Sequence, residues 1–450
     1  MKQALKVGVS GVRGVVGDSL TPQIVMSFAQ AFGTFVGSGT VVVGRDTRPS
    51  GLMFQEAVVA GLQSVGCKPL LLGVQPTPTI LMQTRAVGAR GGIAITASHN
   101  PGPWNALKFV DRSGMFLNRT RADELFDIYH QQDFPFVAEQ DLQATEWLDS
   151  PFRLHSDRVL SYVDEAAVAR KRLKVAVDCC HGVGALHTVD FLKRLGCEVV
   201  SMSDEPSGEF VRDPEPTPEH IGALCQLVKE QGCDVGFAQD PDGDRLAIVD
   251  EKGEAIGEDL SVAFAIRQVL IHHQAGPVVI NLSASKGIEE MARGLGADVI
   301  RTPTGEIHVS EKMVEVDAVA GGEHTGGVII PAIHPCRDSY SAMALVLELM
   351  ASEGKPISWL RNDVPRYSLL RDKLPIRGDQ APLILRSLRR HFEGEKMSLM
   401  DGVYVDFGDS WIQVRRSFTE PVLRLFAEAP DEVRSQELLA ELKHLIEKTL

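Results

Sequence analysis

Three stretches of this chain repeat one pattern: an apolar strand, a polar turn, a helix, and a return strand that follows a glycine. They span residues 41–67, 175–197 and 278–297. In each stretch, apolar residues at the 3.6-residue spacing of a helix lie between two short apolar runs, which is typical of a βαβ unit. The repetition predicts an α/β protein with three similar mixed α/β domains.

The C-terminal part departs from this pattern. Residues 403–407 and 412–414 alternate between apolar and polar side chains, as antiparallel strands do. Residues 431–450 have the periodicity of an amphipathic helix. These features predict a fourth domain of the α+β class.

Length also favours several domains, because 450 residues are too many for one hydrophobic core. Charged or proline-containing stretches near residues 150–156, 251–258 and 362–376 are the candidate joints. The resulting domains are residues 1–152, 153–253 and 254–366 for the three α/β domains and 367–450 for the α+β domain.

Charge and composition exclude some kinds of partner. The net charge of −14 argues against nucleic acid, and it means that an anionic substrate must be attracted by local arginine and lysine. The seven cysteines lack the spacing of a zinc site, so we expect reduced packing residues in a cytoplasmic protein. No apolar run approaches about 18 residues and no signal-like segment opens the chain, so no membrane partner is expected.

The first candidate catalytic segment is residues 96–101, Thr-Ala-Ser-His-Asn-Pro. It follows the apolar run 91–95, which is typical of a buried strand, and its Asn-Pro step ends regular structure. We expect Ser98 to be exposed at the tip of that strand, available as a phosphoryl carrier. Taken alone, the segment is explained better by an ordinary turn.

The second segment is Asp240-Pro241-Asp242-Gly243-Asp244-Arg245, between the apolar runs 235–238 and 246–249. Three carboxylates between buried strands would repel one another without a cation, and their oxygens suit Mg²⁺ or Ca²⁺. A solvated acidic turn is the alternative. An EF-hand is excluded because Arg245 occupies the position where that loop needs glycine.

Two further loops suit a sugar phosphate. In residues 415–421, arginines followed by hydroxyls can cradle a phosphate dianion, although ordinary surface is the alternative. In residues 321–327, glycines let the backbone approach a ligand, and Glu323 and Thr325 can bond neighbouring sugar hydroxyls. A flexible hairpin loop is the alternative here.

Together these four loops resemble the four signatures of the α-D-phosphohexomutase family, which contains phosphoglucomutases, phosphomannomutases and phosphoglucosamine mutases. The match spans nearly the whole chain in the family's order, and residues 8–14 resemble the family's N-terminal G-[IV]-R-G segment. The resemblance implies a four-domain, heart-shaped architecture around a central cleft, with one signature loop from each domain.

The resemblance also implies roles for individual residues. Ser98 would rest as phosphoserine, and one Mg²⁺ would be held by Ser98, Asp240, Asp242 and Asp244. Arg245 would steady the transferring group, Lys108 is a candidate general base, Arg13 matches the family's N-terminal arginine, and His99 would support the loop. The residues implied in substrate binding are Thr304, Gly305, Glu323 and Thr325 for the sugar, and Arg415, Ser417 and Thr419 for the phosphate that does not react.

The implied reaction converts a hexose 6-phosphate to the 1-phosphate through a hexose 1,6-bisphosphate, which turns over between two transfers. That turn calls for a polar cleft and a hinged C-terminal domain. Features such as residues 209–218 are closest to archaeal-type phosphoglucosamine mutases, so glucosamine phosphate leads glucose or mannose phosphate. A metal-dependent phosphatase using the same serine and an inactive sugar-phosphate binder stay as alternatives, and the enzyme would be a monomer or homodimer.

Four positions depart from the family's pattern. Phe418 stands where the phosphate loop normally has glycine or asparagine. The sugar loop commonly has serine and histidine where this chain has Thr325 and Gly327. Glu306 stands where histidine or aspartate often follows the Thr-Gly pair. We expect the last of these to bear on substrate choice.

Overall fold

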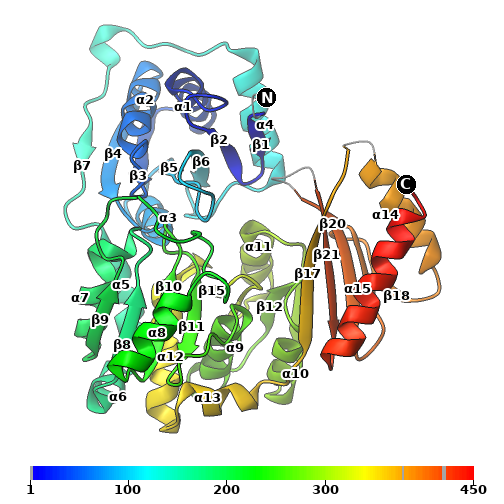
Figure 1. The fold of residues 1–450 in the computed structure, drawn as a ribbon. Coiled ribbons are helices and arrows are strands. Elements are labelled where there is room, and N and C mark those ends of the chain that lie inside the picture. Colours follow the sequence, from blue (N-terminus) through cyan, green and yellow to red (C-terminus); the bar gives the residue numbers. More distant parts are fainter. Residues whose placement is uncertain (1–3, 378–379, 418–421) are drawn as a thin grey trace.

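The computed structural model describes residues 4–377, 380–417 and 422–450. Within them the chain forms four units in sequence order, each built on one sheet. Figure 1 shows the first unit at the upper left, the second and third below it, and the fourth at the right. The predicted mixed α/β architecture with a different C-terminal domain is confirmed.

The first unit has a sheet of parallel and antiparallel strands, with helices on its faces. Helix α1 (Pro22–Val36) begins where Thr21 accepts a hydrogen bond from the N–H of Ile24 (3.4 Å), with proline in the first turn. Its strands, in sheet order, are β1 (Lys6–Gly8), β2 (Gly11–Val15), β6 (Trp104–Asp111), β5 (Gly91–Ile95), β3 (Gly39–Arg45), β4 (Cys67–Val74) and β7 (Glu146–Trp147). Its other helices are α2 (Gly51–Ser64), α3 (Thr77–Ala86), α4 (Arg119–Gln131) and the 3₁₀ turn η1 (Glu139–Asp141).

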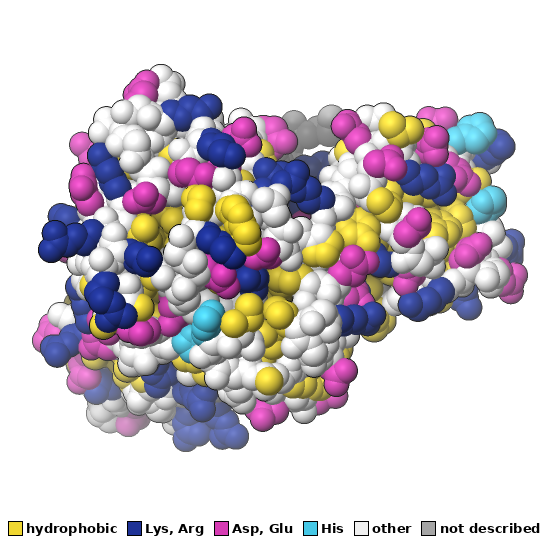
Figure 2. All heavy atoms as spheres, turned by 90° about the horizontal axis from the view of Figure 1, so that it is seen from below, with side chains coloured by type: hydrophobic (Ala, Val, Ile, Leu, Met, Phe, Trp, Pro, Cys, Tyr) yellow, Lys and Arg dark blue, Asp and Glu magenta, His cyan; other side chains and the backbone are white. Residues whose placement is uncertain are grey.

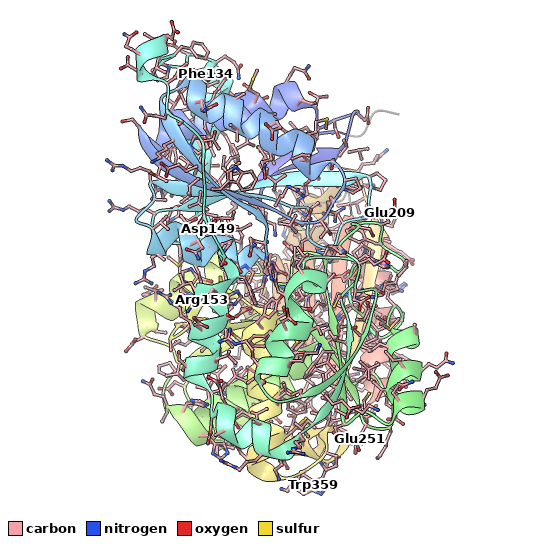
Figure 3. The ribbon with its side chains drawn as sticks, turned by 90° about the vertical axis from the view of Figure 1, so that its left-hand side faces the viewer. Phe134, Asp149, Arg153, Glu209, Glu251 and Trp359 are labelled. Atoms are coloured by element: carbon pink, nitrogen blue, oxygen red, sulfur yellow. The ribbon has the colours of Figure 1, made fainter. Side chains whose placement is uncertain are left out.

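A long connection leads from the first unit to the second. Figure 3 shows the chain passing from Phe134, near one end of the molecule, to Asp149 and then to Arg153 on the next unit. The second unit has strands β11 (Leu246–Asp250), β10 (Val235–Gln239), β8 (Lys174–Asp178) and β9 (Glu198–Met202) in sheet order. Its helices are α5 (Phe152–Tyr162), α6 (Glu165–Lys171), α7 (Gly184–Arg194) and α8 (Gly222–Gln231).

The third unit has a five-stranded sheet. Its strands, in sheet order, are β13 (Val299–Thr302), β12 (Val278–Asn281), β14 (Ala320–Glu323), β15 (Gly327–Ile330) and β16 (His334–Arg337). Its helical segments are α9 (Asp259–Gln268), the π-helical η2 (Val269–His273), α10 (Lys286–Gly294), α11 (Glu306–Val316), α12 (Ser339–Glu353), α13 (Ile357–Leu360) and the 3₁₀ turn η3 (Arg361–Asp363).

The fourth unit is an antiparallel sheet covered by two helices. Its strands, in sheet order, are β17 (Ser368–Pro375), β21 (Val422–Ala429), β20 (Trp411–Arg416), β19 (Val403–Asp406) and β18 (Lys396–Ser398), and its helices are α14 (Gln380–His391) and α15 (Glu432–Glu447).

The first three units share one strand order, which explains the sequence repeat. The shared orders are β4-β3-β5-β6, β9-β8-β10-β11 and β13-β12-β14-β15. In each, the first three strands are parallel and the last pairs antiparallel with the third. The third and fourth strands of each unit are therefore joined by a hairpin loop at the same place in the topology.

The molecule has one sheet in each of its four units, but its hydrophobic cores do not follow the same division. The second and third units share one continuous core, which includes Phe237 and Leu345. The first unit has its own core around Phe28 and Phe54, and the fourth has its own around Leu425. The second and third units therefore form one packed body, to which the first and fourth are joined.

The surface and the cysteines agree with the composition. On the face shown in Figure 2, charged side chains of both signs are interspersed. All seven cysteines lie in the described residues and are free thiols. Among the helices of the described ranges, none has the length and apolar character needed to cross a bilayer.

Candidate active site

Three of the four loops singled out in the sequence are hairpin loops within the described residues. Residues 96–103 join β5 to β6, residues 240–245 join β10 to β11, and residues 324–326 join β14 to β15. Short antiparallel connections hold polar residues at the ends of buried strands, so each of the first three units presents one loop. The fourth segment, residues 415–421, begins in β20, which pairs antiparallel with β21, and its residues 418–421 lie outside the described residues.

Ser98 is buried, not exposed as the sequence predicted. Only 5% of its surface is accessible, because the loop of the second unit covers it. Its Oγ donates a hydrogen bond to Asp240 Oδ2 (2.8 Å), and its N–H donates to Thr96 Oγ1 (2.9 Å). The backbone of Ser98 lies in the left-handed region, with φ of 47°, which aims the side chain toward the second unit.

Arg48 holds the Ser98 loop from behind, and sequence reasoning missed it. Its Nη2 donates to the carbonyl oxygens of Ser98 (2.7 Å) and Asn100 (2.6 Å), and its Nη1 donates to those of Pro101 and Trp104. The guanidinium is fully buried and pairs with Asp46 (3.1 Å). The sequence did contain a signal for Arg48: it lies just after the carboxyl end of the apolar strand β3, which is a common place for a functional polar residue.

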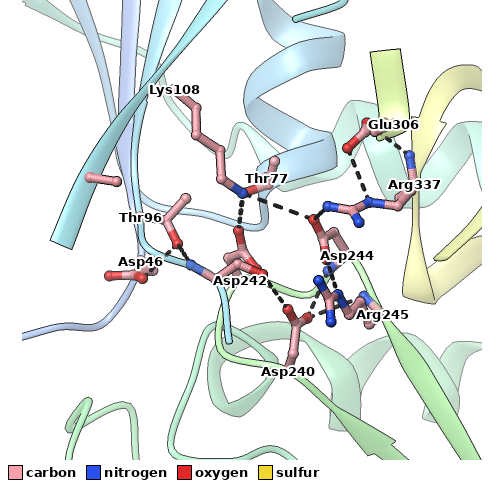
Figure 4. A network of polar contacts seen from close by, with 12 residues as sticks. Asp46, Thr77, Thr96, Lys108, Asp240, Asp242, Asp244, Arg245, Glu306 and Arg337 are labelled. Atoms are coloured by element: carbon pink, nitrogen blue, oxygen red, sulfur yellow. Dashed lines mark hydrogen bonds and ion pairs between the residues drawn. The ribbon is translucent and has the colours of Figure 1, made fainter. Parts of the chain in front are cut away.

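The three loop aspartates form a buried cluster, as Figure 4 shows. One ligand oxygen from each of Asp240, Asp242 and Asp244 lies within 4.8 Å of the others. Among the described residues, Asp242 Oδ1 and Asp244 Oδ1 have no hydrogen-bond partner although both are buried. Unpartnered buried carboxylate oxygens are costly, and a hard divalent cation would satisfy them, so the cluster fits Mg²⁺.

The electrostatics of the cluster point the same way. Burial, followed by the Asp244 and Asp242 carboxylates, raises the pKa of Asp240 well above its ordinary value. Burial acts to raise the pKa of Asp242, but the charge of Lys108 and the hydrogen bonds with Asp240, Lys108 and Thr77 together hold that pKa below the usual range. A site that disfavours three ionised carboxylates together is suited to a bound cation.

Three cations, Lys108, Arg245 and Arg337, lie against this cluster. Lys108 Nζ donates to Asp242 Oδ2 (2.9 Å), and the lysine is buried, which excludes an ordinary surface lysine. Arg245 pairs through Nη1 with Glu215 Oε1 (2.8 Å), and its Nε is 3.8 Å from Asp244 Oδ1. Lys108 and Arg245 are therefore both oriented by carboxylates beside the Ser98 loop.

Arg13 and His99 lie on the same side of the site. Arg13 Nη1 donates to Asn100 Oδ1 (3.1 Å), and burial together with Arg245 lowers the pKa of Arg13 to about 10. Burial, then Arg245 and Arg13, lowers the pKa of His99 well below its ordinary value, so this imidazole stays neutral.

The candidate sugar loop is anchored through Glu323. Its Oε1 accepts from the N–H of Gly305 (2.7 Å), and its Oε2 accepts from Arg337 Nη1 (2.9 Å). The neighbouring Thr325 lines a cavity of about 880 Å³ between the second, third and fourth units. A cavity of this size can hold a hexose phosphate.

The candidate phosphate loop is linked to the third unit by Asp401. Asp401 Oδ2 accepts from the N–H of Thr304 (3.2 Å) and lies 3.7 Å from Arg415 Nε. Arg415 is buried, and the N–H of Ser417 donates to the Val422 carbonyl (2.9 Å). Phe418 and Thr419, which the sequence also singled out, lie outside the described residues.

Polar contacts therefore run through all four units. From Ser98 they pass to Asp240 in the metal loop, and from Asp244 in that loop to Arg337 (2.6 Å). From Arg337 they continue through Glu323 and Gly305 to Thr304, Asp401 and Arg415. Sequence reasoning missed Arg337 and Asp401 because their partners are far away in the chain.

Known proteins match this chain over its whole length. Models of phosphoglucomutase/phosphomannomutase domains I, II and III match residues 4–136, 154–253 and 258–367, and the model of the C-terminal domain matches residues 379–445. A probable phosphoglucosamine mutase of Methanopyrus kandleri is 34% identical over 98% of this chain and 97% of its own. A phosphoglucomutase/phosphomannomutase of Thermococcus kodakarensis is 34% identical over 98% of both chains.

A solved structure agrees. A phosphoglucomutase/phosphomannomutase family protein of Burkholderia thailandensis superposes with a TM-score of 0.85 at 26% identity, covering 99% of this chain and 96% of that one. The fold and the matched domains define a phosphohexomutase, an enzyme that moves a phosphoryl group within a sugar phosphate. The chain belongs to the phosphoglucomutase/phosphomannomutase family, as its resemblance to archaeal-type members predicted.

Proposed function

We propose that this phosphohexomutase interconverts glucosamine 6-phosphate and glucosamine 1-phosphate through phosphoserine at Ser98. The contact series from Ser98 to Arg415 carries the proposal, because it joins one loop from every unit. A phosphoryl carrier at one end and an arginine at the other suit a sugar that is phosphorylated at either of two positions.

In the proposed reaction, Ser98 Oγ is the atom that donates and accepts the phosphoryl group. In the first transfer, the bond from phosphorus to Ser98 Oγ breaks and a bond to the sugar hydroxyl oxygen forms. Lys108, acting as a neutral amine in this step, accepts the proton of that hydroxyl and becomes an ammonium, which can return the proton in the second transfer. The hexose 1,6-bisphosphate turns over, and Ser98 Oγ then takes the other phosphoryl group while the sugar oxygen recovers a proton.

Mg²⁺ would be held by Asp240, Asp242, Asp244 and a phosphoserine oxygen, and would offset negative charge on the transferring group. Arg245 steadies the oxygens of that group, and Arg13 lies beside the phosphoserine. His99, which stays neutral, supports the loop.

Substrate binding is assigned to the third and fourth units. Glu323 and Thr325 receive the sugar hydroxyls, with the backbone at Thr304 and Gly305 behind them. The residues that grip the phosphate that does not react are Arg415, Ser417 and Thr419. Bidentate arginine recognition gives that phosphate a fixed orientation.

Glucosamine phosphate is proposed as the substrate because of the resemblance to phosphoglucosamine mutases, including the one named in Methanopyrus kandleri. A C2 amine and a C2 hydroxyl can be bound by the same polar groups, so glucose and mannose phosphates are the comparison substrates. The free thiols suit a cytoplasmic enzyme.

The test is an assay of the Mg²⁺-loaded enzyme with glucosamine 6-phosphate, glucose 1-phosphate and mannose 1-phosphate. Each reaction contains the matching bisphosphate, and released inorganic phosphate is measured in parallel. We expect isomerisation without phosphate release and the largest kcat/KM for glucosamine phosphate. Phosphate release without isomerisation would indicate a phosphatase, and no turnover would indicate a sugar-phosphate binder.

A further inference from the structure

Arg337, at the end of β16, contacts three carboxylates: one in the loop between β10 and β11, one at the end of β14 and one at the start of α11. Its Nη2 is 2.6 Å from Asp244 Oδ2, its Nη1 is 2.9 Å from Glu323 Oε2, and its Nε is 3.1 Å from Glu306 Oε2. Figure 4 shows its guanidinium extending from the side of Glu306 toward Asp244. Only 11% of the side chain is exposed. The planar fork of arginine can satisfy several buried carboxylates at once, which a lysine ammonium cannot do in the same geometry.

Gly327 provides the space for this side chain. A Cβ atom at position 327 would lie 2.3 Å from Cδ and 2.9 Å from Cγ of Arg337. Such distances are far inside van der Waals contact, so any other residue at 327 would displace Arg337. Glycine in place of histidine at position 327 therefore leaves the room that the Arg337 side chain occupies.

Glu306 fixes the other side of Arg337. Its Oε2 accepts from Arg337 Nε, and its Oε1 accepts from the N–H of Arg337 (3.1 Å). Glu306 is the first residue of α11, where the helix dipole favours a carboxylate. Two of the departures in the third unit, Glu306 and Gly327, thus concern one side chain.

The fixed position of Arg337 in turn fixes the Glu323 carboxylate. Its Oε1 accepts from the N–H of Gly305 (2.7 Å) and from Asn281 Nδ2 (3.4 Å), and its Oε2 accepts from Arg337, so Oε2 keeps a lone pair for another donor. Arg337 also ties this carboxylate to Asp244, so the sugar loop and the metal loop are held at a set separation.

We propose that Arg337 is a positioning residue for the sugar site, admitted by Gly327 and oriented by Glu306, which holds Glu323 in place for the sugar hydroxyls. This inference rests on the proposed role of Glu323. Because Glu323 binds the sugar in the ground state and the transition state alike, losing its orientation raises KM more than it lowers kcat.

The first test is Arg337→Lys, which keeps the charge and loses the fork. We expect KM for the preferred hexose phosphate to rise about tenfold or more, and kcat to fall by a smaller factor. The matched control is Arg267→Lys, because Arg267 is also a buried arginine with two carboxylate partners (3.0 and 2.9 Å) but lies outside the site. An unchanged KM in Arg337→Lys, or an equal rise in the control, would overturn the proposal.

The second test is a double-mutant cycle of Gly327→Ala and Arg337→Ala, read by thermal midpoint and by KM. We expect Gly327→Ala to be harmful in the wild-type background and nearly neutral where Arg337 has been truncated, because the clash is then absent. Equal effects in both backgrounds would contradict the inference.

The cycle also separates this inference from the proposed function. Thermal midpoints need no substrate, so coupling between Gly327 and Arg337 is measurable even if the wild type turns over none of the sugar phosphates. If the wild type is active and Arg337→Lys leaves KM unchanged, the positioning role alone is wrong.

Discussion

Ser98 adopts a backbone conformation that few residues other than glycine adopt, with φ of 47°. Local strain of this kind persists only where the surroundings hold it, and here Thr96, Asp240 and Arg48 do so. The hydroxyl is therefore aimed by contacts from two units.

Ser98→Ala should lower mutase activity by about three orders of magnitude or more, because the group that carries the phosphoryl is removed. Steady-state kinetics and the thermal midpoint measure this together. The midpoint should stay close to that of the wild type, and Ser161→Ala on the surface is the control. Full activity in Ser98→Ala would refute the carrier role.

Arg48→Lys should destabilise the protein by about 1–3 kcal/mol, because one ammonium cannot bond the several carbonyls that the guanidinium reaches. It should also lower the fraction of enzyme phosphorylated at Ser98, measured by intact mass. Arg45→Lys is the matched control, since Arg45 donates only one weak bond, to Asp46 O (3.3 Å). A phosphorylated fraction equal to that of the wild type would show that Arg48 does not position the loop.

At the scale of elements, the loop between β10 and β11 joins the proposed metal ligands to the first unit. Asp242 accepts from Thr77 Oγ1 (2.8 Å) as well as from Lys108. An alanine here would leave both donors without this partner, so asparagine is the better probe.

Asp242→Asn should lower activity by about a hundredfold or more and abolish the rise in thermal midpoint that Mg²⁺ gives the wild type. Thermal melts at several Mg²⁺ concentrations, with and without chelator, measure the shift independently of activity. The exposed Asp190→Asn is the control. A Mg²⁺-dependent shift that survives in Asp242→Asn would mean that the ion binds elsewhere.

Helix α9 begins at Asp259, whose Oδ2 lies 3.6 Å from Arg371 of β17. Burial raises the pKa of Asp259 to about 8 despite this arginine. A carboxyl whose pKa is higher in the folded state binds more protons there, so stability falls as pH rises from about 4, its unfolded pKa, toward about 8.

Asp259→Asn mimics the protonated group and should reduce this fall. Denaturant unfolding at about pH 5 and about pH 8 gives the two free energies of unfolding for each protein. The exposed Asp149→Asn should leave the difference as in the wild type. An unchanged slope in Asp259→Asn would show that other groups cause the pH dependence.

At the scale of the whole molecule, the three largest hydrophobic clusters of the described residues support four units, and a smaller cluster of Leu282, Tyr404, Trp411 and Phe426 joins the third unit to the fourth. The second and third units should open together, and the fourth should open on its own, which would give the proposed bisphosphate room to turn within the site.

Leu425→Ala should cost about 2–5 kcal/mol and lower hydrogen-exchange protection in the fourth unit alone. Leu345→Ala, an equally buried change in the shared core, should lower protection in the second and third units together. Loss of protection across all four units in Leu425→Ala would mean that the molecule unfolds as one.

Much of the fold was predictable because it depends on local patterns. The repeats at 41–67, 175–197 and 278–297 each carry a complete strand–helix–strand signal, and the structure gives all three the same strand order. The residue types of the four loops were equally readable, since turn residues between apolar runs mark hairpins.

The sequence by itself determined the three α/β units, the C-terminal antiparallel unit and the chemical groups in each loop. Tertiary structure alone decided which of those groups meet: Ser98 is bonded to a residue 142 positions away, and Arg337 to one 93 positions away. Periodicity and turn chemistry act over a few residues, whereas a buried charge is satisfied by whatever the packing of separate units brings beside it.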